Sequence, residues 1–217
     1  MISLLKILET VDSPINGKIQ VVETLEGRRL LVGGISQSGW LVARVWKTAL
    51  SKVKKDRQEV SKVLILGLGG GSAAELVQNY WSQAQITGVE IDKNMVNLGK
   101  KYLQLGLPAG RQGELGKLKV IIGDAEKWVK RGRGNNFDLI LVDLYVGGKI
   151  PEAFTAKKFM SDVFRLLKSG GVAAFNHLYS NIEKEDATKF EKSLKKVFPV
   201  LTTVTPEANI IFIAYKE

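Results

Sequence analysis

Residues 63–92 read VLILGLGGGSAAELVQNYWSQAQITGVEID, and this stretch decides the fold. Residues 63–66 form a continuous apolar run, as expected for a parallel strand that is buried on both faces. The glycines that follow permit a tight turn, Ser72 is a candidate N-cap, and good helix formers come next. Residues 86–89 are a second strand, which ends in Glu90. The stretch therefore predicts a strand–helix–strand unit of a parallel sheet.

The same unit offers groups that suit a nucleoside. The glycine loop would let the backbone approach a ligand, which would also face the positive end of the following helix. Glu90 lies 19 positions after Gly71, close to the roughly 20-residue spacing at which an acid binds a ribose diol in dinucleotide folds. A glycine turn alone is equally consistent with a plain strand-to-helix connection, so the prediction depends on the coincidence of the two features.

Two further acids follow apolar runs. Asp124 comes after the strand predicted at residues 118–122, and Asp143 comes after the strand predicted at residues 137–142. Because the carboxyl ends of parallel strands share one edge of a sheet, glycines and carboxylates from four strands should meet there. We therefore expect the ligand site at this edge.

The rest of the chain fits an α/β fold with two units, residues 1–60 and 61–217. The first unit shows two strands and a linking helix, and the second alternates strands with helices. The last two strands are joined by a link too short for a crossover helix, so they should pair antiparallel. The prediction is a Rossmann-like, mostly parallel seven-stranded sheet with an antiparallel last strand, preceded by a small N-terminal β-hairpin segment. The other elements are predicted at 18–24, 28–32, 40–55, 93–105, 125–131, 155–168, 171–176, 183–197, 200–205 and 209–215.

Composition narrows the function classes. The 217 residues include 45% hydrophobic residues and no cysteine, so one sizeable core is expected, without disulfides or a thiol nucleophile. No run approaches the ~20 apolar residues of a membrane span, and no secretory signal is evident, which makes the cytoplasm the expected location. The net charge of +10 is scattered without interleaved aromatic residues, which disfavours nucleic-acid binding. No cluster with metal-ligand spacing is present, so no metal site is expected.

Taken together, these motifs resemble a known family. The glycine loop, Glu90, Asp124 and Asp143 occur in the order seen in the class I AdoMet-dependent methyltransferase fold. Residues 28–37 (RRLLVGGISQ), 150–155 (IPEAFT) and 167–172 (LKSGGV) resemble segments of its spermidine synthase branch. The resemblance extends from about residue 15 to residue 176.

The resemblance implies a role for each candidate residue. The donor would be S-adenosyl-L-methionine (AdoMet) or its decarboxylated form, with Glu90 on the ribose hydroxyls and Asp124 near the adenine amino group. Asp143 would also contact the donor and would be the acid beside the reacting nucleophile, with Tyr145 as a second catalytic and substrate-binding group. The remaining implied donor-binding residues are Gln37, Gly67, Gly69, Gly70, Gly71, Ile91 and Ala125, and the remaining candidate substrate-binding residues are Glu152 and His177.

Three departures from the spermidine synthase pattern affect the expected reaction. Gly70 stands where that family has an aspartate that binds the donor amine, and Val146 stands where it has a second acid. Residues 38–40 (SGW) replace a Tyr-His-Glu stretch. We expect Gly70 to leave backbone N–H groups free for the α-carboxylate of intact AdoMet, although it is also consistent with a merely tight turn.

The favoured interpretation is methyl transfer from AdoMet to a small nucleophile, with Asp143 as the base. One alternative is aminopropyl transfer from decarboxylated AdoMet to a polyamine, which acids such as Glu152 would grip. The other is a nucleoside-binding protein that lacks catalysis. His177, the only histidine, is interpreted either as an exposed or capping residue or as a second base. The acceptor is expected to be a small molecule such as an amine, and the family resemblance suggests a homodimer.

Overall fold

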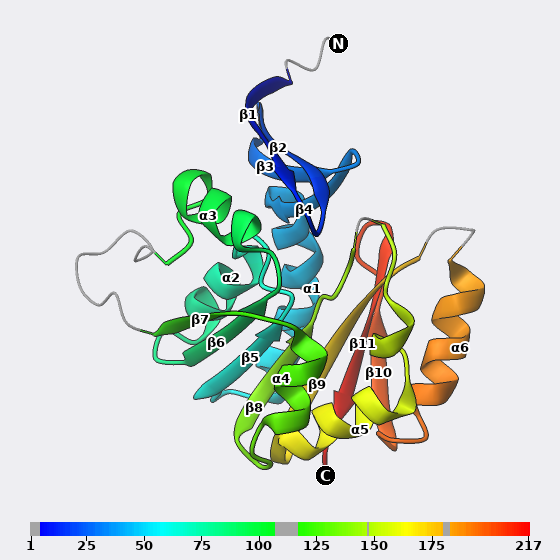
Figure 1. The fold of residues 1–217 in the computed structure, drawn as a ribbon. Helices are drawn as coiled ribbons and strands as arrows, with labels where there is room; N and C mark the ends of the chain where they lie inside the picture. Colours follow the sequence, from blue (N-terminus) through cyan, green and yellow to red (C-terminus); the bar gives the residue numbers. More distant parts are fainter. Residues whose placement is uncertain (1–4, 107–116, 147, 180–182) are drawn as a thin grey trace.

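The computed structural model describes residues 5–106, 117–146, 148–179 and 183–217, and it shows two sheets joined by helix α1 (Trp40–Asp56) (Figure 1). The N-terminal sheet is antiparallel, with strand order β1-β2-β3-β4. Its strands are β1 (Lys6–Ser13), β2 (Gly17–Thr24), β3 (Gly27–Val32) and β4 (Ile35–Gly39).

The second sheet has seven strands in the order β10-β11-β9-β8-β5-β6-β7. Neighbouring strands from β9 to β7 run parallel, whereas β11 runs antiparallel to both β9 and β10. The prediction of a mostly parallel seven-stranded sheet with an antiparallel last strand is confirmed. The strands are β5 (Lys62–Leu66), β6 (Gln85–Glu90), β7 (Leu118–Ile122), β8 (Phe137–Val142), β9 (Leu167–Leu178), β10 (Val200–Val204) and β11 (Asn209–Tyr215).

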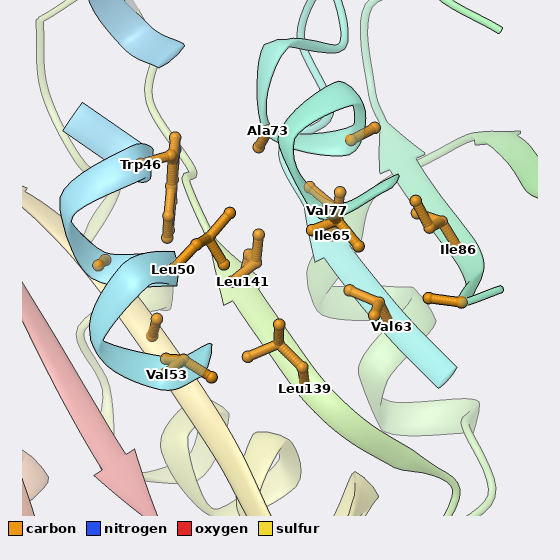
Figure 2. Close-up of a cluster of buried hydrophobic side chains, with 14 of the residues drawn as sticks. Trp46, Leu50, Val53, Val63, Ile65, Ala73, Val77, Ile86, Leu139 and Leu141 are labelled. Atoms are coloured by element: carbon orange, nitrogen blue, oxygen red, sulfur yellow. The ribbon is translucent and has the colours of Figure 1, made fainter. Parts of the chain in front are cut away.

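Helices cover both faces of this sheet. On β5, Val63 and Ile65 pack under α1 and α2 (Ser72–Tyr80), while the alternate residues Leu64 and Leu66 face the opposite core. Figure 2 shows Trp46 of α1 lying over the first of these cores. The second core contains α4 (Ala125–Arg131), α5 (Lys157–Leu166) and α6 (Lys184–Leu194). No helix within the described ranges is both long and apolar enough to span a membrane.

Helix α3 (Lys93–Tyr102) attaches the N-terminal sheet to the larger one. Met95 and Leu98 pack against Ile19 and Leu30 in a third apolar cluster. The side chain of Asp92, which caps α3 by accepting from the Asn94 N–H, also accepts hydrogen bonds from Ser13 and Asn16. These contacts hold the small sheet over the carboxyl ends of the central strands (Figure 1).

Three local details differ from the prediction. The N-terminal hairpin of β2 and β3 is present, but β1 and β4 extend it to a four-stranded sheet; these two strands were not predicted because their sequences show no clear strand pattern. Strand β9 begins at Leu167, before its glycine pair, instead of at residue 171. Gly71, in the left-handed region, is the N-cap of α2, and the Ser72 hydroxyl instead accepts a hydrogen bond from the Gly39 N–H.

Candidate functional site

A cavity of about 550 Å³ lies at the carboxyl ends of the parallel strands, at the edge that the sequence predicts. Its floor carries Gly69 after β5, Glu90 of β6, Asp124 after β7 and Asp143 after β8, and Gln37 of β4 lines it from the small sheet. The volume is within the range of ~300–1,000 Å³ that is typical of small-molecule sites. The fold thus brings glycines and three acids from four strands into one cavity.

The glycine loop is fixed by hydrogen bonds to the end of β6. The N–H groups of Gly67 and Leu68 both donate to the carbonyl oxygen of Val89. Gly67 has a φ of +84°, and a Cβ there would lie 2.0 Å from the backbone oxygen of Asp143. Only glycine therefore fits at position 67, because the residue that follows β5 lies directly against the backbone of the residue that follows β8.

Glu90 is buried and its two oxygens are held by the backbone. One oxygen accepts from the Gly69 N–H at 2.7 Å, and the other accepts from the Asp92 N–H at 2.9 Å. Burial raises the pKa of Glu90, while the bonds from Asp92 and Gly69 act in the opposite direction. Since each carboxylate oxygen has two lone pairs, Glu90 keeps acceptor capacity for a diol in the cavity.

Asp124, Ala125 and Ile91 form the end of the cavity beside β7. One Asp124 oxygen accepts from the N–H groups of Glu126 and Lys127, so Asp124 is the N-cap of α4. Ile91 is 47% exposed and lines the cavity together with Ala125. An apolar surface beside one carboxylate suits a flat heteroaromatic ring with an amino group.

Asp143 lies on the opposite side and is held by two donors. Trp46 Nε1 donates to Oδ2 at 2.8 Å, and Asn176 Nδ2 donates to Oδ1 at 2.9 Å. Asn176 is itself oriented by Asn209, whose Nδ2 donates to Asn176 Oδ1 at 2.9 Å. Desolvation raises the pKa of Asp143, and the bonds from Trp46 and Asn176 lower it. The carboxylate is therefore rigid and a stronger proton acceptor than one in water.

Tyr145 stands next to Asp143 and also lines the cavity. Its hydroxyl donates to the carbonyl oxygen of Asn176 at 3.1 Å. Burial, reinforced by the charge of Asp143, raises the pKa of Tyr145 well above its ordinary value. Tyr145 is thus a neutral phenol at physiological pH and cannot serve as a base there.

Two predicted glycines do not reach the cavity. The Gly70 N–H donates to Ser38 Oγ at 2.6 Å, and a Cβ at this position would meet Leu30 and Leu103. The expectation that Gly70 leaves its N–H free for an anion is therefore wrong. Gly71 caps α2, and a Cβ there would collide with Leu105, so its role is in packing.

His177 and Glu152 also lie away from the cavity lining. His177 is buried, with its ring 3.9 Å from that of Phe190 and 5.6 Å from that of Phe212, measured between centroids. Desolvation lowers the pKa of His177 to about 4. It is therefore neither the exposed or capping residue nor the base that the sequence suggested. Glu152 is exposed on the short 3₁₀ helix Glu152–Phe154, and its neighbours Ala153 and Phe154 line the cavity instead.

Sequence reasoning missed two residues of the site. Trp46 is the first, because its helical position indicates only a core residue and its hydrogen bond to Asp143 spans 97 positions in the chain. Asn176 is the second, and it lines the cavity, whereas the next residue, His177, does not. Asn176 was predictable in principle, because it lies near the end of a buried strand, at the same edge as the other polar residues of the site.

Comparisons with known proteins agree with this geometry. The family model described as the spermine/spermidine synthase domain matches residues 47–216. A polyamine aminopropyltransferase of Prochlorococcus marinus (strain MIT 9312) is 28% identical over 205 residues, covering 87% of this chain and 68% of the relative. A solved spermidine synthase in complex with the transition-state analogue AdoDATO superposes with a TM-score of 0.80 at 18% identity, covering 98% of this chain and 74% of that chain.

One relative of a different kind is the eEF1A lysine and N-terminal methyltransferase homolog of Drosophila melanogaster. It is 29% identical over 172 residues, which cover 75% of this chain but only 24% of the relative. The chain thus resembles proteins named for two different transfer reactions.

Proposed function

The chain belongs to the spermine/spermidine synthase domain family and is thus a transferase with an AdoMet-type donor, and we propose that it transfers an aminopropyl group to an amine. The structural observation that best supports a group transfer is Asp143, a rigid carboxylate with a raised pKa in the same cavity as Glu90 and the glycine loop. The family match favours aminopropyl transfer over the methyl transfer that the sequence pattern suggested.

In this proposal the donor lies across the strand ends. Glu90 accepts hydrogen bonds from the ribose hydroxyls, and Asp124 accepts one from the adenine amino group, with Ile91 and Ala125 beside the ring. Gln37 and the backbone at Gly69 approach the sulfonium end. The remaining lone pairs of Glu90 and the volume of the cavity fit such a nucleoside.

The transfer itself needs little more than alignment and one base. The amine nitrogen attacks the carbon bonded to the sulfonium sulfur, the C–S bond breaks with its electron pair going to sulfur, and the nitrogen loses a proton. Asp143 accepts that proton, because desolvation makes its carboxylate more basic. Tyr145, as a neutral phenol, lines the cavity with its ring and donates its hydroxyl hydrogen bond to the Asn176 carbonyl.

Methyl transfer from intact AdoMet is the second candidate. Val146, where the resemblance implies a second acid, is 46% exposed and offers no charge to hold an amine. The resemblance implies an aspartate at position 70 to bind the donor amine, but this chain has Gly70 there, and Gly70 does not line the cavity. The Drosophila relative bears the name of a methyltransferase. The Gly70 N–H already donates a hydrogen bond to Ser38, so it does not provide an argument for binding of the AdoMet carboxylate.

A product assay separates the two reactions. The purified protein is incubated with 1,4-diaminobutane and either decarboxylated AdoMet or AdoMet, and the nucleoside product is identified by mass spectrometry. Release of methylthioadenosine with aminopropylated amine supports the proposal, and release of S-adenosylhomocysteine with methylated amine supports the second candidate. If a panel of amines yields neither product, both are refuted.

A binding measurement tests the donor site independently. Glu90→Gln keeps a side chain of similar size but removes the charge from the predicted diol contact. Because hydrogen bonds to a charged group are worth roughly 1.5–3 kcal/mol, we expect donor affinity to fall about tenfold or more by calorimetry. Glu75→Gln, on helix α2, is the control and should leave affinity unchanged. Equal affinity of Glu90→Gln and the control would remove the ribose assignment.

A further inference from the structure

Arg29 of β3 brings a positive charge to the cavity, and no established role in the site accounts for it. Its side chain lines the cavity, and its guanidinium carbon lies 5.5 Å from the centroid of the Trp40 ring. Its Nε is buried and has no hydrogen-bond partner. A guanidinium is always charged and carries five N–H donors, so the buried, unpartnered Nε–H of this half-buried side chain is costly.

Two neighbouring arginines behave differently. Arg28, on the opposite face of the same strand, pairs with Glu23 at 3.0 Å. Arg44 also approaches the Trp40 ring, at 5.7 Å from its centroid, and pairs with Glu207 at 2.6 Å. Within the described part of the chain, no carboxylate lies within ion-pair distance of Arg29. Two of these three cations therefore have a carboxylate at contact distance, whereas Arg29, which lines the cavity, interacts with Glu26 only at longer range.

The position of Arg29 relative to the reaction centre follows from helix α1. Trp40, on which Arg29 stacks, begins the helix, and Trp46, which holds Asp143, lies six residues later. Six residues of α-helix span about 9 Å. Between them, Leu41, Val42 and Val45 give the cavity an apolar wall. The cavity therefore carries a cation, Arg29, and a carboxylate, Asp143, with an apolar surface between them.

Arg29 disfavours a simple diamine relative to a substrate that carries a carboxylate, because the guanidinium repels a second ammonium group. A carboxylate would supply what Arg29 lacks, since guanidinium and carboxylate match in charge and can form two parallel hydrogen bonds. The contact with the Trp40 ring restricts the guanidinium, which limits the entropy lost on binding.

We infer that Arg29 binds a carboxylate group of a substrate, so that one of the two reactants is an amino acid rather than a plain amine. This inference rests on the proposed group transfer but not on which group moves. The carboxylate belongs either to the acceptor, as in an α,ω-diamino acid, or to the methionine part of intact AdoMet.

Two matched pairs of compounds distinguish these sources. AdoMet is compared with decarboxylated AdoMet for binding by calorimetry, and ornithine is compared with 1,4-diaminobutane for binding and for transfer in the presence of each donor. Each pair differs by one carboxylate. The wild-type protein is expected to prefer the carboxylate-bearing member of one pair by about tenfold or more.

The arginine variants test whether Arg29 causes the preference. Arg29→Met should abolish it, Arg29→Lys should retain part of it, and the control Arg28→Met should leave it intact. Circular dichroism and thermal melting check that each variant is folded. If Arg29→Met does not fold, the Arg29→Lys and Arg28→Met pair still decides, because a reduced preference is expected only in the former.

The outcomes separate this inference from the proposed function. Lack of preference in both pairs, or an equal preference in Arg29→Met and wild type, overturns the role of Arg29. Transfer without any carboxylate preference refutes this inference alone. A carboxylate preference in binding without transfer supports it and counts against the proposed reaction alone.

Discussion

The hydrogen bond from Trp46 to Asp143 should control the pH at which the enzyme works. Trp46→Phe keeps an aromatic ring in the core but removes the Nε1–H that donates to Asp143 Oδ2 at 2.8 Å. The bond favours the charged form of Asp143, so its loss raises the pKa of that carboxyl group further. Activity should then require a higher pH.

The size of the effect follows from two contributions. A hydrogen bond to a charged group is worth roughly 1.5–3 kcal/mol, and 1.36 kcal/mol corresponds to one pKa unit. Asn176 still donates to Oδ1, so we expect the lower value and a shift of about one pH unit. Trp46 is fully buried, so the smaller ring also leaves a void, and the unfolding free energy should fall by about 2–4 kcal/mol in all.

The assay is the pH dependence of kcat/KM, which reports groups of the free enzyme. The acid limb of the Trp46→Phe profile should lie about one pH unit above that of wild type. Trp81→Phe is the matched control, because Trp81 is also buried and its Nε1 donates to the neutral carbonyl of Gln58 at 3.2 Å. It should lose stability without moving the limb. An unmoved limb in Trp46→Phe, or the same movement in both variants, would refute the assignment of Asp143 as the base.

Three further predictions concern single positions. Asp143→Asn should lower turnover by ~100-fold or more in steady-state assays. Since the raised pKa means that ionised Asp143 destabilises the native state, wild type should lose stability in urea titrations as the pH rises above 3.8, and Asp143→Asn should lack this pH dependence. Burial of neutral His177 should cost wild type about 3 kcal/mol of stability as the pH falls from 6.5 to about 4, and His177→Leu should show a flatter profile in urea titrations. Gly67→Ala should lower the free energy of unfolding by more than about 3 kcal/mol, because its Cβ meets the Asp143 carbonyl. The control Gly33→Ala, which has a positive φ but open space, should lower it by about 1–2 kcal/mol. Equal losses of stability in thermal melts would contradict this prediction.

The large sheet was predictable from the sequence because its strands are buried on both faces. Residues 63–66 and 139–142 are continuous apolar runs, and short runs of this kind are typical of the central strands of a parallel sheet. The missed strands lack such a run. Lys6–Ser13 has only one buried residue, and Ile35–Gly39 consists mainly of small polar residues that pair with β3. Their existence depends on pairing partners that single-strand patterns do not reveal.

The acids of the site were predictable because topology alone gathers the ends of parallel strands. The direction in which each side chain points was harder to predict from the sequence. On β9, Asn176 faces the cavity and His177 faces the opposite core, because successive side chains of a strand alternate between its faces. A one-residue difference therefore decided which of the two belongs to the site. The prediction for Gly70 was wrong for a related reason, since Ser38 from a separate sheet occupies its N–H.

The hydrogen bonds around Asp143 also determine where its proton must come from. The Trp46 Nε1–H can only donate, and Asn176 must present its Nδ2 because Asn209 already donates to its Oδ1. Both carboxylate oxygens thus meet a donor on the protein side, and a proton can be added only to the remaining lone pairs. Since Asp143 lines the cavity, that proton has to arrive from the substrate side. In the proposed reaction, the three residues that fix the carboxylate leave its free lone pairs for the acceptor, which is why loss of the Trp46 donor should alter the pH profile as well as the stability.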